Sequence, residues 1–340
     1  MSALTGFVLV VMGGIMVGTY FLGLRYVKPW KWENVWSIYA LFALVILPVG
    51  LAVATVPHLG AVYGQTPGKD LLGIFLYGAG WGIGSVLSGL GVARLGMAIG
   101  VSVVIGISAA LGTLVPLVVN TPELVFAKKG LMVIASVVTL LLGVLLVALG
   151  GKERDRSRAG GALPPVLAGS FAGGLAICIF SGIFSSMLNY ALAFSKSISQ
   201  AALNFGATSF GSVNAVWMVA LFAGFIANAI YTVYLLSKNK TWSNFATPGT
   251  SLGWVIAFFM AVLWTGGVVL YGHGASRMGQ LGSVLGWPVF MATMIIVSSL
   301  WGFASGEWKG ANSRAKRLMF AGLVVLMVAS GLVGIVNKLQ

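Results

Sequence analysis

The sequence is poor in the residues that carry most enzyme chemistry. Its 340 residues include one cysteine, two histidines and six acidic residues. A single cysteine, Cys178, excludes a disulfide framework and a cysteine-based metal cluster. The chain also has no GxxxxGK(S/T) phosphate-binding loop and no HExxH zinc motif, so neither ATP-driven pumping nor zinc-dependent hydrolysis is indicated. We expect no metal ion and no cofactor.

Charge of any kind is also scarce, which excludes a water-soluble globule. Charged residues make up 8% of the chain and apolar residues 59%, whereas soluble domains are about 25% charged. Apolar runs of about 20 residues cross the bilayer core as helices. The chain is therefore predicted to be an all-α polytopic membrane protein with ten transmembrane helices. They are expected near residues 4–24, 34–56, 70–92, 97–119, 130–150, 165–190, 207–236, 250–272, 281–303 and 317–338.

The charges that remain are mostly positive, and their positions predict the topology. Of the 20 lysine and arginine residues, fourteen lie in the loops after the odd-numbered spans and six lie on the opposite side. The positive-inside rule then places the odd loops in the cytoplasm and both termini in the periplasm of a bacterial inner membrane. This distribution accounts for the net charge of +14 without a nucleic-acid partner.

Two stretches of the chain resemble each other at a constant shift of 183 residues. Residues 81–96 read WGIGSVLSGLGVARLG, and residues 264–279 read WTGGVVLYGHGASRMG. A weaker match pairs Gly14 with Gly182 at a shift of 168 residues. The change of shift indicates about fifteen extra residues in the second copy, around 197–210.

Each copy contains five spans, so the second copy is expected to cross the membrane upside down relative to the first. The predicted organisation is a first five-helix repeat (1–150), a basic cytoplasmic connector (151–164) and a second five-helix repeat (165–340). Inverted repeats are typical of secondary transporters, whose solute site lies near the midplane between the copies. The alternative is an old duplication that now serves only packing.

Several segments resemble the L-rhamnose–proton symporter family of the drug/metabolite transporter superfamily. The resemblance is strongest over residues 81–116. It extends to Trp30-x-Trp32-Glu33-x-x-Trp36-Ser37, Gly182-Ile183-Phe184-Ser185, Gly272-His273 and Glu307-Trp308. The resemblance implies a fold of ten helices in two inverted repeats and sugar uptake coupled to protons.

A sugar site needs aromatic faces against the C–H surface of the ring and amides or hydroxyls against its rim. Serine in a membrane helix also bonds its own backbone, and tryptophan also serves packing, so structural roles stay open for these residues. The candidate substrate-binding residues are Tyr77, Trp81, Ser88, Ser181, Ser185, Asn189, Trp264 and Trp287.

Proton coupling needs a group that changes its protonation state during transport. No aspartate or glutamate lies in the middle of a predicted span, which leaves His273 inside the 250–272 region's end and glutamates near helix ends. The repeat counterpart of His273 is Leu90. A packing role for the histidine and interfacial ion pairs with Lys309 or Lys128 for the glutamates are the alternatives. The candidate proton-coupling residues are His273, Glu307, Glu33 and Glu123.

Arg94 and Arg277 end equivalent spans of the two copies on opposite sides of the membrane. They are expected to cap helix C-termini or to form gate salt bridges.

The expected function is import of a small sugar, L-rhamnose or a related 6-deoxy sugar or aldose, by proton symport with alternating access. The expected partners are the sugar, the proton and the lipid bilayer, and no enzyme activity is expected. The alternatives are an exporter or carrier of another small polar metabolite, and a membrane sensor with the same fold that does not transport.

Overall fold

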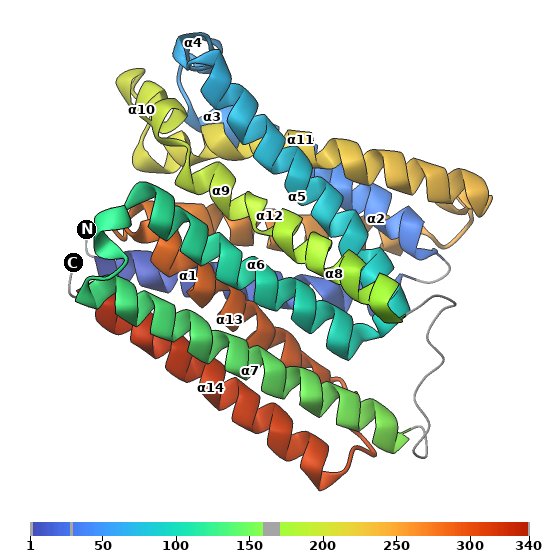
Figure 1. Ribbon diagram of the computed structural model, residues 1–340. Coiled ribbons are helices and arrows are strands. Elements are labelled where there is room, and N and C mark those ends of the chain that lie inside the picture. The colour runs from blue at the N-terminus through green and yellow to red at the C-terminus, as the bar shows by residue number, and fades with distance from the viewer. Residues whose placement is uncertain (1–2, 28–29, 159–170, 339–340) are drawn as a thin grey trace.

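The computed structural model describes residues 3–27, 30–158 and 171–338, and this part of the chain is almost entirely helical (Figure 1). Ten of its segments are long and apolar enough to cross a membrane. The prediction of ten membrane-spanning helices is confirmed. The segments are Ala3–Leu24, Trp32–Thr55, Gly68–Leu95, Met97–Asn120, Lys128–Arg158, Phe171–Asn204, Ser209–Lys238, Ser251–Ser276, Gly282–Ala304 and Ser313–Val336.

Some spans are single helices and others are broken by short irregular turns. In chain order the helices are α1 (Ala3–Thr19), η1 (Tyr20–Tyr26), α2 (Trp32–Leu41), η2 (Phe42–Ile46), α3 (Leu47–Thr55), α4 (Leu59–Gln65), α5 (Gly68–Leu95), α6 (Met97–Asn120), η3 (Pro122–Leu124), α7 (Lys128–Arg158), α8 (Phe171–Ser185), α9 (Met187–Ala193), α10 (Lys196–Asn204), α11 (Ser209–Lys238), η4 (Trp242–Ala246), α12 (Ser251–Ser276), α13 (Gly282–Ala304) and α14 (Ser313–Lys338).

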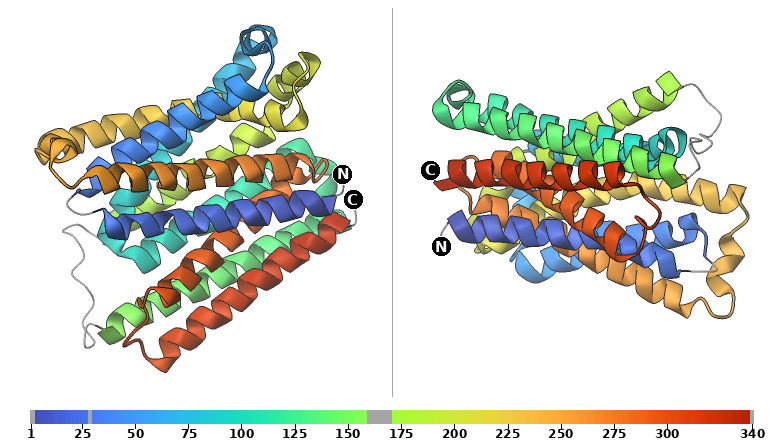
Figure 2. Two further views of the ribbon diagram at one scale, coloured as in Figure 1. Left: turned by 180° about the vertical axis from the view of Figure 1, so that it is seen from behind. Right: turned by 90° about the horizontal axis from the view of Figure 1, so that it is seen from below.

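Helices from the two halves of the chain interleave. From the first half, α1 packs against α12 and α13, and from the second half, α8 packs against α5 and α6. The last helices of the two halves, α7 and α14, lie side by side along one edge of the molecule (Figures 1 and 2). Both termini lie at the same end, and α7 finishes at the opposite end. We refer to these as the terminal end and the opposite end.

Glycine lets the helix backbones touch where the two halves meet. A Cβ atom added at Gly13 of α1 would lie 2.5 Å from the carbonyl oxygen of Gly267 on α12, and one added at Gly274 would lie 2.6 Å from that of Gly6. On the other side of the molecule, an added Cβ at Gly78 of α5 would collide with the backbone of Ala220 on α11. Because lipid is as apolar as the helices, such close packing supplies the attraction that the hydrophobic effect supplies in water.

The predicted connector begins inside a helix. Helix α7 continues to Arg158, so the first eight residues of the range 151–164 extend it beyond the apolar core. Residues 159–164 lie outside the described residues. The basic side chains Lys152, Arg154, Arg156 and Arg158 therefore project from the end of a helix.

The sixth span is broken. Helix α8 ends at Ser185 and α9 begins at Met187, and α9 is followed by α10 over Lys196–Asn204. Helix α10 falls within the region where the change of shift predicts extra residues. The first span is interrupted at a comparable place, where α1 passes into η1 at Tyr20.

The glycine contacts predict a position-dependent cost of added side chains. Gly78→Val places a β-branched side chain against the Ala220 backbone, and we expect it to lower stability by about 1–3 kcal/mol. Gly73→Val on the same helix faces open space and is the matched control. The melting temperatures of the two variants in detergent measure the difference. Equal melting temperatures would show that the α5–α11 contact is not tight.

Candidate functional site

Two tryptophans from different halves of the chain stack on each other. Trp81 lies near the middle of α5 and Trp264 near the middle of α12. Their ring centroids are 5.2 Å apart and their planes differ by 26°. Trp264 is buried and Trp81 is half-buried. The structure thus brings two of the predicted substrate residues together at mid-depth of their spans.

The stack continues as a row of aromatic rings along α2 and α1. Trp264 meets Tyr39 edge-on, with centroids 6.3 Å apart. Tyr39 in turn lies 4.8 Å from Trp36 and stacks on Tyr20 at 5.5 Å. The sequence prediction did not include Tyr20, Trp36 or Tyr39 as site residues. The available signal is the helical spacing of Trp32, Trp36 and Tyr39, which puts three rings on one face of α2.

A buried amide lies beside this aromatic row. The side-chain oxygen of Asn228 on α11 accepts hydrogen bonds from Trp36 Nε1 and Ser85 Oγ, both at 3.0 Å. Its Nδ2 donates to the Gly224 carbonyl at 2.9 Å. Asn228 therefore links α2, α5 and α11 through a side chain that also offers polar contact at depth.

Helix α2 passes into a π-helical turn, η2, next to the tryptophan stack. Within this turn the carbonyl of Ala43 accepts a hydrogen bond from Thr265 Oγ1 at 2.9 Å. Thr265 follows Trp264 directly. Single π-turns inside α-helices are frequent at functional sites because they free backbone groups for other contacts.

Tyr77 lies one turn before Trp81 and contacts other rings. Its ring meets Tyr190 edge-on at 5.8 Å and Phe194 at 5.7 Å. Both partners belong to the broken sixth span, so Tyr77 extends the aromatic surface from α5 to α9. Ser88, two turns further along α5, is half-buried.

The predicted stripe of Ser181, Ser185 and Asn189 does not lie on one continuous helix, since the chain turns at Ser186. Ser181 is buried and donates to the Gly84 carbonyl at 2.8 Å, which ties α8 to α5. Ser185 is half-buried. Asn189 lies on α9, beyond the turn.

Asn189 is the centre of a fully buried polar contact. Its Nδ2 donates to the carbonyls of Gly112 at 2.7 Å and Ser283 at 3.2 Å. The hydroxyl of Tyr271 donates to its Oδ1. These bonds join α6, α9, α12 and α13 in the half of the molecule near the termini. The sequence prediction did not include Tyr271, although it lies next to the Gly272-His273 pair.

Trp287 strengthens the same region. It is 1% exposed, and its Nε1 donates to the Ser108 carbonyl on α6 at 2.9 Å. Helix α13 continues through Pro288 without a break. Trp287 therefore joins α6 to α13 and belongs to the closed contact around Asn189 rather than to the Trp81–Trp264 stack.

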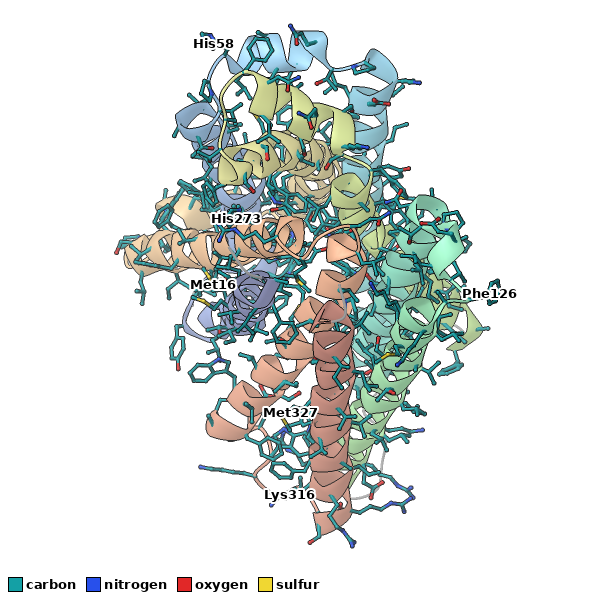
Figure 3. All side chains as sticks on the ribbon, turned by 90° about the vertical axis from the view of Figure 1, so that its left-hand side faces the viewer. Met16, His58, Phe126, His273, Lys316 and Met327 are labelled. Atoms are coloured by element: carbon teal, nitrogen blue, oxygen red, sulfur yellow. The ribbon has the colours of Figure 1, made fainter. Side chains whose placement is uncertain are left out.

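His273 lies near the end of α12 and is 7% exposed. Its ring meets Phe210 of α11 edge-on at 5.2 Å, and its buried Nδ1 has no hydrogen-bond partner among the described residues. The Nε1 of Trp217, which faces Gly272, is buried in the same condition. Figure 3 shows His273 within the helical body and His58, the other histidine, at its outer edge.

The glutamates lie at helix ends. Glu33, in the first turn of α2, is buried, and its Oε1 accepts hydrogen bonds from Asn239 Nδ2 and Thr241 Oγ1, both at 2.9 Å. This carboxylate fixes α2 against the loop after α11. Glu123 is exposed in η3.

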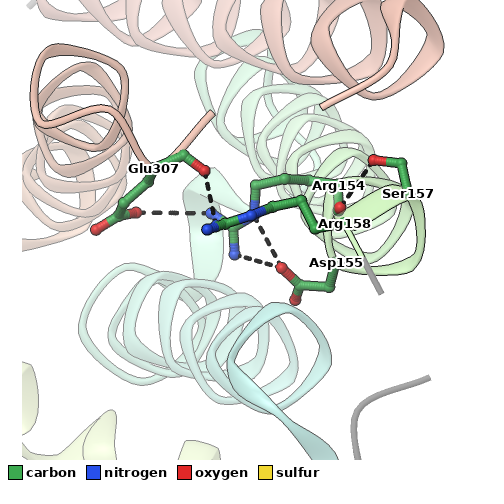
Figure 4. Close-up of polar contacts among 5 residues, drawn as sticks. All are labelled: Arg154, Asp155, Ser157, Arg158 and Glu307. Carbon is green, nitrogen blue, oxygen red and sulfur yellow. Dashed lines mark hydrogen bonds and ion pairs between the residues drawn. The ribbon is translucent and has the colours of Figure 1, made fainter. Parts of the chain in front are cut away.

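Glu307 joins the two halves at the opposite end. One carboxylate oxygen lies 3.6 Å from Nη1 of Arg154, and its backbone carbonyl accepts a hydrogen bond from Arg158 at 3.1 Å (Figure 4). Arg154 also contacts Asp155 at 2.8 Å and lies over the Trp308 ring. The ionic partner is thus an arginine of α7, whereas the sequence suggested Lys309.

Arg94 lies in the last turn of α5, and Arg277 follows the last turn of α12. Both positions suit a cation, because the helix dipole leaves partial negative charge at a C-terminus.

The mid-depth residues offer aromatic faces, amides and hydroxyls, which suit a neutral polar solute with C–H surface. Within residues 3–27, 30–158 and 171–338, no three His, Cys, Asp or Glu side chains come close enough to hold a metal ion. The fold and this contact between halves define a multi-pass helical membrane protein whose two halves meet in an aromatic centre.

Comparison with known proteins identifies the family. The chain belongs to the L-rhamnose-proton symport protein (RhaT) family, whose model matches residues 2–338. It is 27% identical over 333 residues to the L-rhamnose-proton symporters of Salmonella dublin, Salmonella enteritidis and Salmonella gallinarum, with 95% of each chain covered. The resemblance seen in the sequence is confirmed. The family consists of membrane transporters rather than enzymes.

Proposed function

We propose that this protein imports L-rhamnose, or an aldose of similar shape, together with a proton across a bacterial inner membrane. The observation that carries the proposal is the Trp81–Trp264 stack at mid-depth in a chain that matches the symporter family over nearly its full length. The methyl group and C–H faces of a 6-deoxy sugar suit aromatic rings, and its hydroxyls suit amides such as that of Asn228.

The transport proposal includes an inverted repeat, which the glycine contacts support. Gly84 of α5 lies against Phe184 and Ser185 of α8. Shifting Gly84 by 183 residues gives Gly267 of α12, which lies against Met16 and Val17 of α1, and these precede Phe184 and Ser185 by 168 residues. The same two shifts relate Gly91–Cys178 to Gly274–Val10. Contacts in one half therefore recur in the other.

Two further helix pairs follow the same rule. Gly182 lies against Ile107, and its counterpart Gly14 lies against Thr293, so α6 corresponds to α13. The contact of α7 with α14 corresponds to itself, because Gly143 meets Leu326 and Gly322 meets Val147 under one common shift. A self-matched contact is what an approximate two-fold axis between α7 and α14 requires.

The two ends of the molecule differ, as an alternating-access transporter requires. At the terminal end, the buried contacts of Asn189, Tyr271 and Trp287 join both halves. Under the shift that relates α6 to α13, Gly112 and Trp287 correspond to Ser298 and Val101 at the opposite end. Ser298 is exposed and Val101 is half-buried, whereas Gly112 and Trp287 are buried. We infer a state that is closed at the terminal end.

The orientation of this state follows from the positive-inside prediction, which places both termini in the periplasm. The closed contact around Asn189 then faces the periplasm, and the conformation faces inward. In the outward-facing state, Val101 and Ser298 would close the cytoplasmic side as Trp287 and Gly112 close the other.

His273 is our candidate for the proton-binding residue. It lies inside a span, and it is buried with one ring nitrogen unpartnered. It also neighbours Tyr271, which belongs to the closed periplasmic contact. Protonation of this ring would add a donor at Nδ1 beside that contact, and a group there links proton binding to the opening of the gate.

Uptake into proteoliposomes tests the sugar assignment. With acid outside, labelled L-rhamnose should accumulate above the external concentration, and a protonophore should abolish the gradient. Trp81→Ala should raise the half-saturating sugar concentration about tenfold, since a lost aromatic contact is worth about 1 kcal/mol or more, and Trp81→Phe should retain part of the affinity. Trp242→Ala in η4, outside the spans, is the control. Uptake of another solute without any rhamnose uptake would overturn the assignment.

The histidine role predicts a separation of exchange from accumulation. His273→Gln should still exchange labelled for unlabelled sugar, but it should lose accumulation driven by the pH gradient, because the proton no longer binds near the gate. His58→Gln removes the other, exposed histidine and should behave as the unaltered protein. Both rates are measured in the same vesicles. Normal accumulation by His273→Gln would exclude it as the coupling residue.

The repeat predicts a contact that forms in the outward-facing state. In a Cys178→Ala background, the pair Val101→Cys and Ser298→Cys should cross-link as the protein cycles and should then stop transport until the disulfide is reduced. Val101→Cys with Leu300→Cys is the matched control, because Leu300 is 50% exposed and lies on another face of α13. Equal cross-linking of the two pairs would contradict the proposed correspondence of α6 and α13.

A further inference from the structure

A cavity opens at the end of α13, away from the aromatic centre. It has a volume of about 530 Å³ and lies between the turn after α13 and the start of α14. Its lining combines aromatic rings with two lysines, and the residues that matter here are Phe303, Ser305, Trp308, Lys309, Lys316 and Phe320. Such a lining is amphipathic, with cationic groups and apolar rings in one space.

The cationic part of the cavity comes from two elements. Gly306 adopts a positive φ of 79°, which turns the chain back after α13, and the aliphatic stem of Lys309 passes over this glycine. Lys316 lies in the first turn of α14. Both lysines are exposed, and within the described part of the chain neither ammonium group has a carboxylate at ion-pairing distance. The cavity thus presents two positive charges without compensating negative ones.

The apolar part consists of stacked rings. Phe303 lies 4.6 Å from the Trp308 ring and 4.9 Å from the Phe320 ring, centroid to centroid. Phe320 follows Lys316 by one helical turn and is 52% exposed, so an ammonium group and an apolar surface lie next to each other on α14. The exposed ring sits where α14 enters its apolar span.

The site lies at the boundary between the spans and the opposite end. Helix α13 ends at Ala304 and the apolar span of α14 begins at Ser313. Figure 3 shows Lys316 at one extremity of the molecule, far from His58. A ligand with a charged head and an apolar tail could place its head at the lysines and its tail along Phe320, in the direction of the bilayer.

We infer that this cavity binds one anionic phospholipid, with the headgroup phosphate between Lys309 and Lys316 and an acyl chain against Phe303 and Phe320. The positive charge of the lining selects a lipid with net negative charge, and the exposed aromatic surface selects a lipid over a free phosphate. Because Glu307 and Trp308 of the same turn contact Arg154 of α7, a bound lipid would also brace the contact between the two halves.

Native mass spectrometry of the full-length protein tests the lipid site. Titration with phosphatidylglycerol should show one preferentially retained lipid. The double variant Lys309→Gln/Lys316→Gln should weaken its binding about thirtyfold, from about 1 kcal/mol per cation. Lys238→Gln/Lys240→Gln removes the same charge from another loop after an odd-numbered span and should leave the binding unchanged. Lys309→Arg/Lys316→Arg should retain it.

Three results would overturn the inference: equal loss in both glutamine variants, equal retention of zwitterionic phosphatidylethanolamine, or displacement of the lipid by glycerol 3-phosphate, which carries the head without the tail. A measurement on the unaltered protein covers the case in which the glutamine variant does not fold. Phosphatidylglycerol should raise its melting temperature above that in phosphatidylethanolamine, and no rise would also overturn the site.

Discussion

Direct contact between helix backbones at glycine is the interaction on which the structure depends. In a membrane, side chains gain little by leaving lipid for protein, so helices must approach closely to attract each other. Here the closest approaches, Gly13 with Gly267 and Gly78 with Ala220, join helices far apart in the chain. They hold α5 and α12 in place, and these two helices carry Trp81 and Trp264. The aromatic centre therefore rests on positions that have no side chain.

The same packing explains how a chain with few polar groups can change shape in an ordered way. The contacts made through glycine recur in both halves, whereas the bonds of Asn189, Tyr271 and Trp287 exist at one end only. Under the proposed mechanism, the first set stays constant and the second set exchanges with its counterpart. Few hydrogen bonds then need to break for the gate to open, and each has a defined replacement.

The spans were predictable because hydrophobic length and charge are local properties of the sequence. The stack of Trp81 and Trp264 was within reach because the repeat marked both residues. The roles of Tyr39 and Tyr271 were not, because each depends on a helix that lies beside it only in three dimensions. The serine and asparagine stripe failed for another reason: periodicity assumes an unbroken helix, and the turn at Ser186 moves Asn189 to a new element. Glu307 likewise found its partner on α7, 153 positions away at Arg154.

The glycine contacts also govern how such a sequence can evolve. A position that faces lipid asks only for an apolar side chain, so Leu, Ile, Val and Phe can replace one another there at little cost. A glycine whose Cβ would meet a backbone has no such substitute. A transporter built in this way can drift to 27% identity over 95% of its length while its architecture persists, since the part of the sequence that fixes the helix crossings is small.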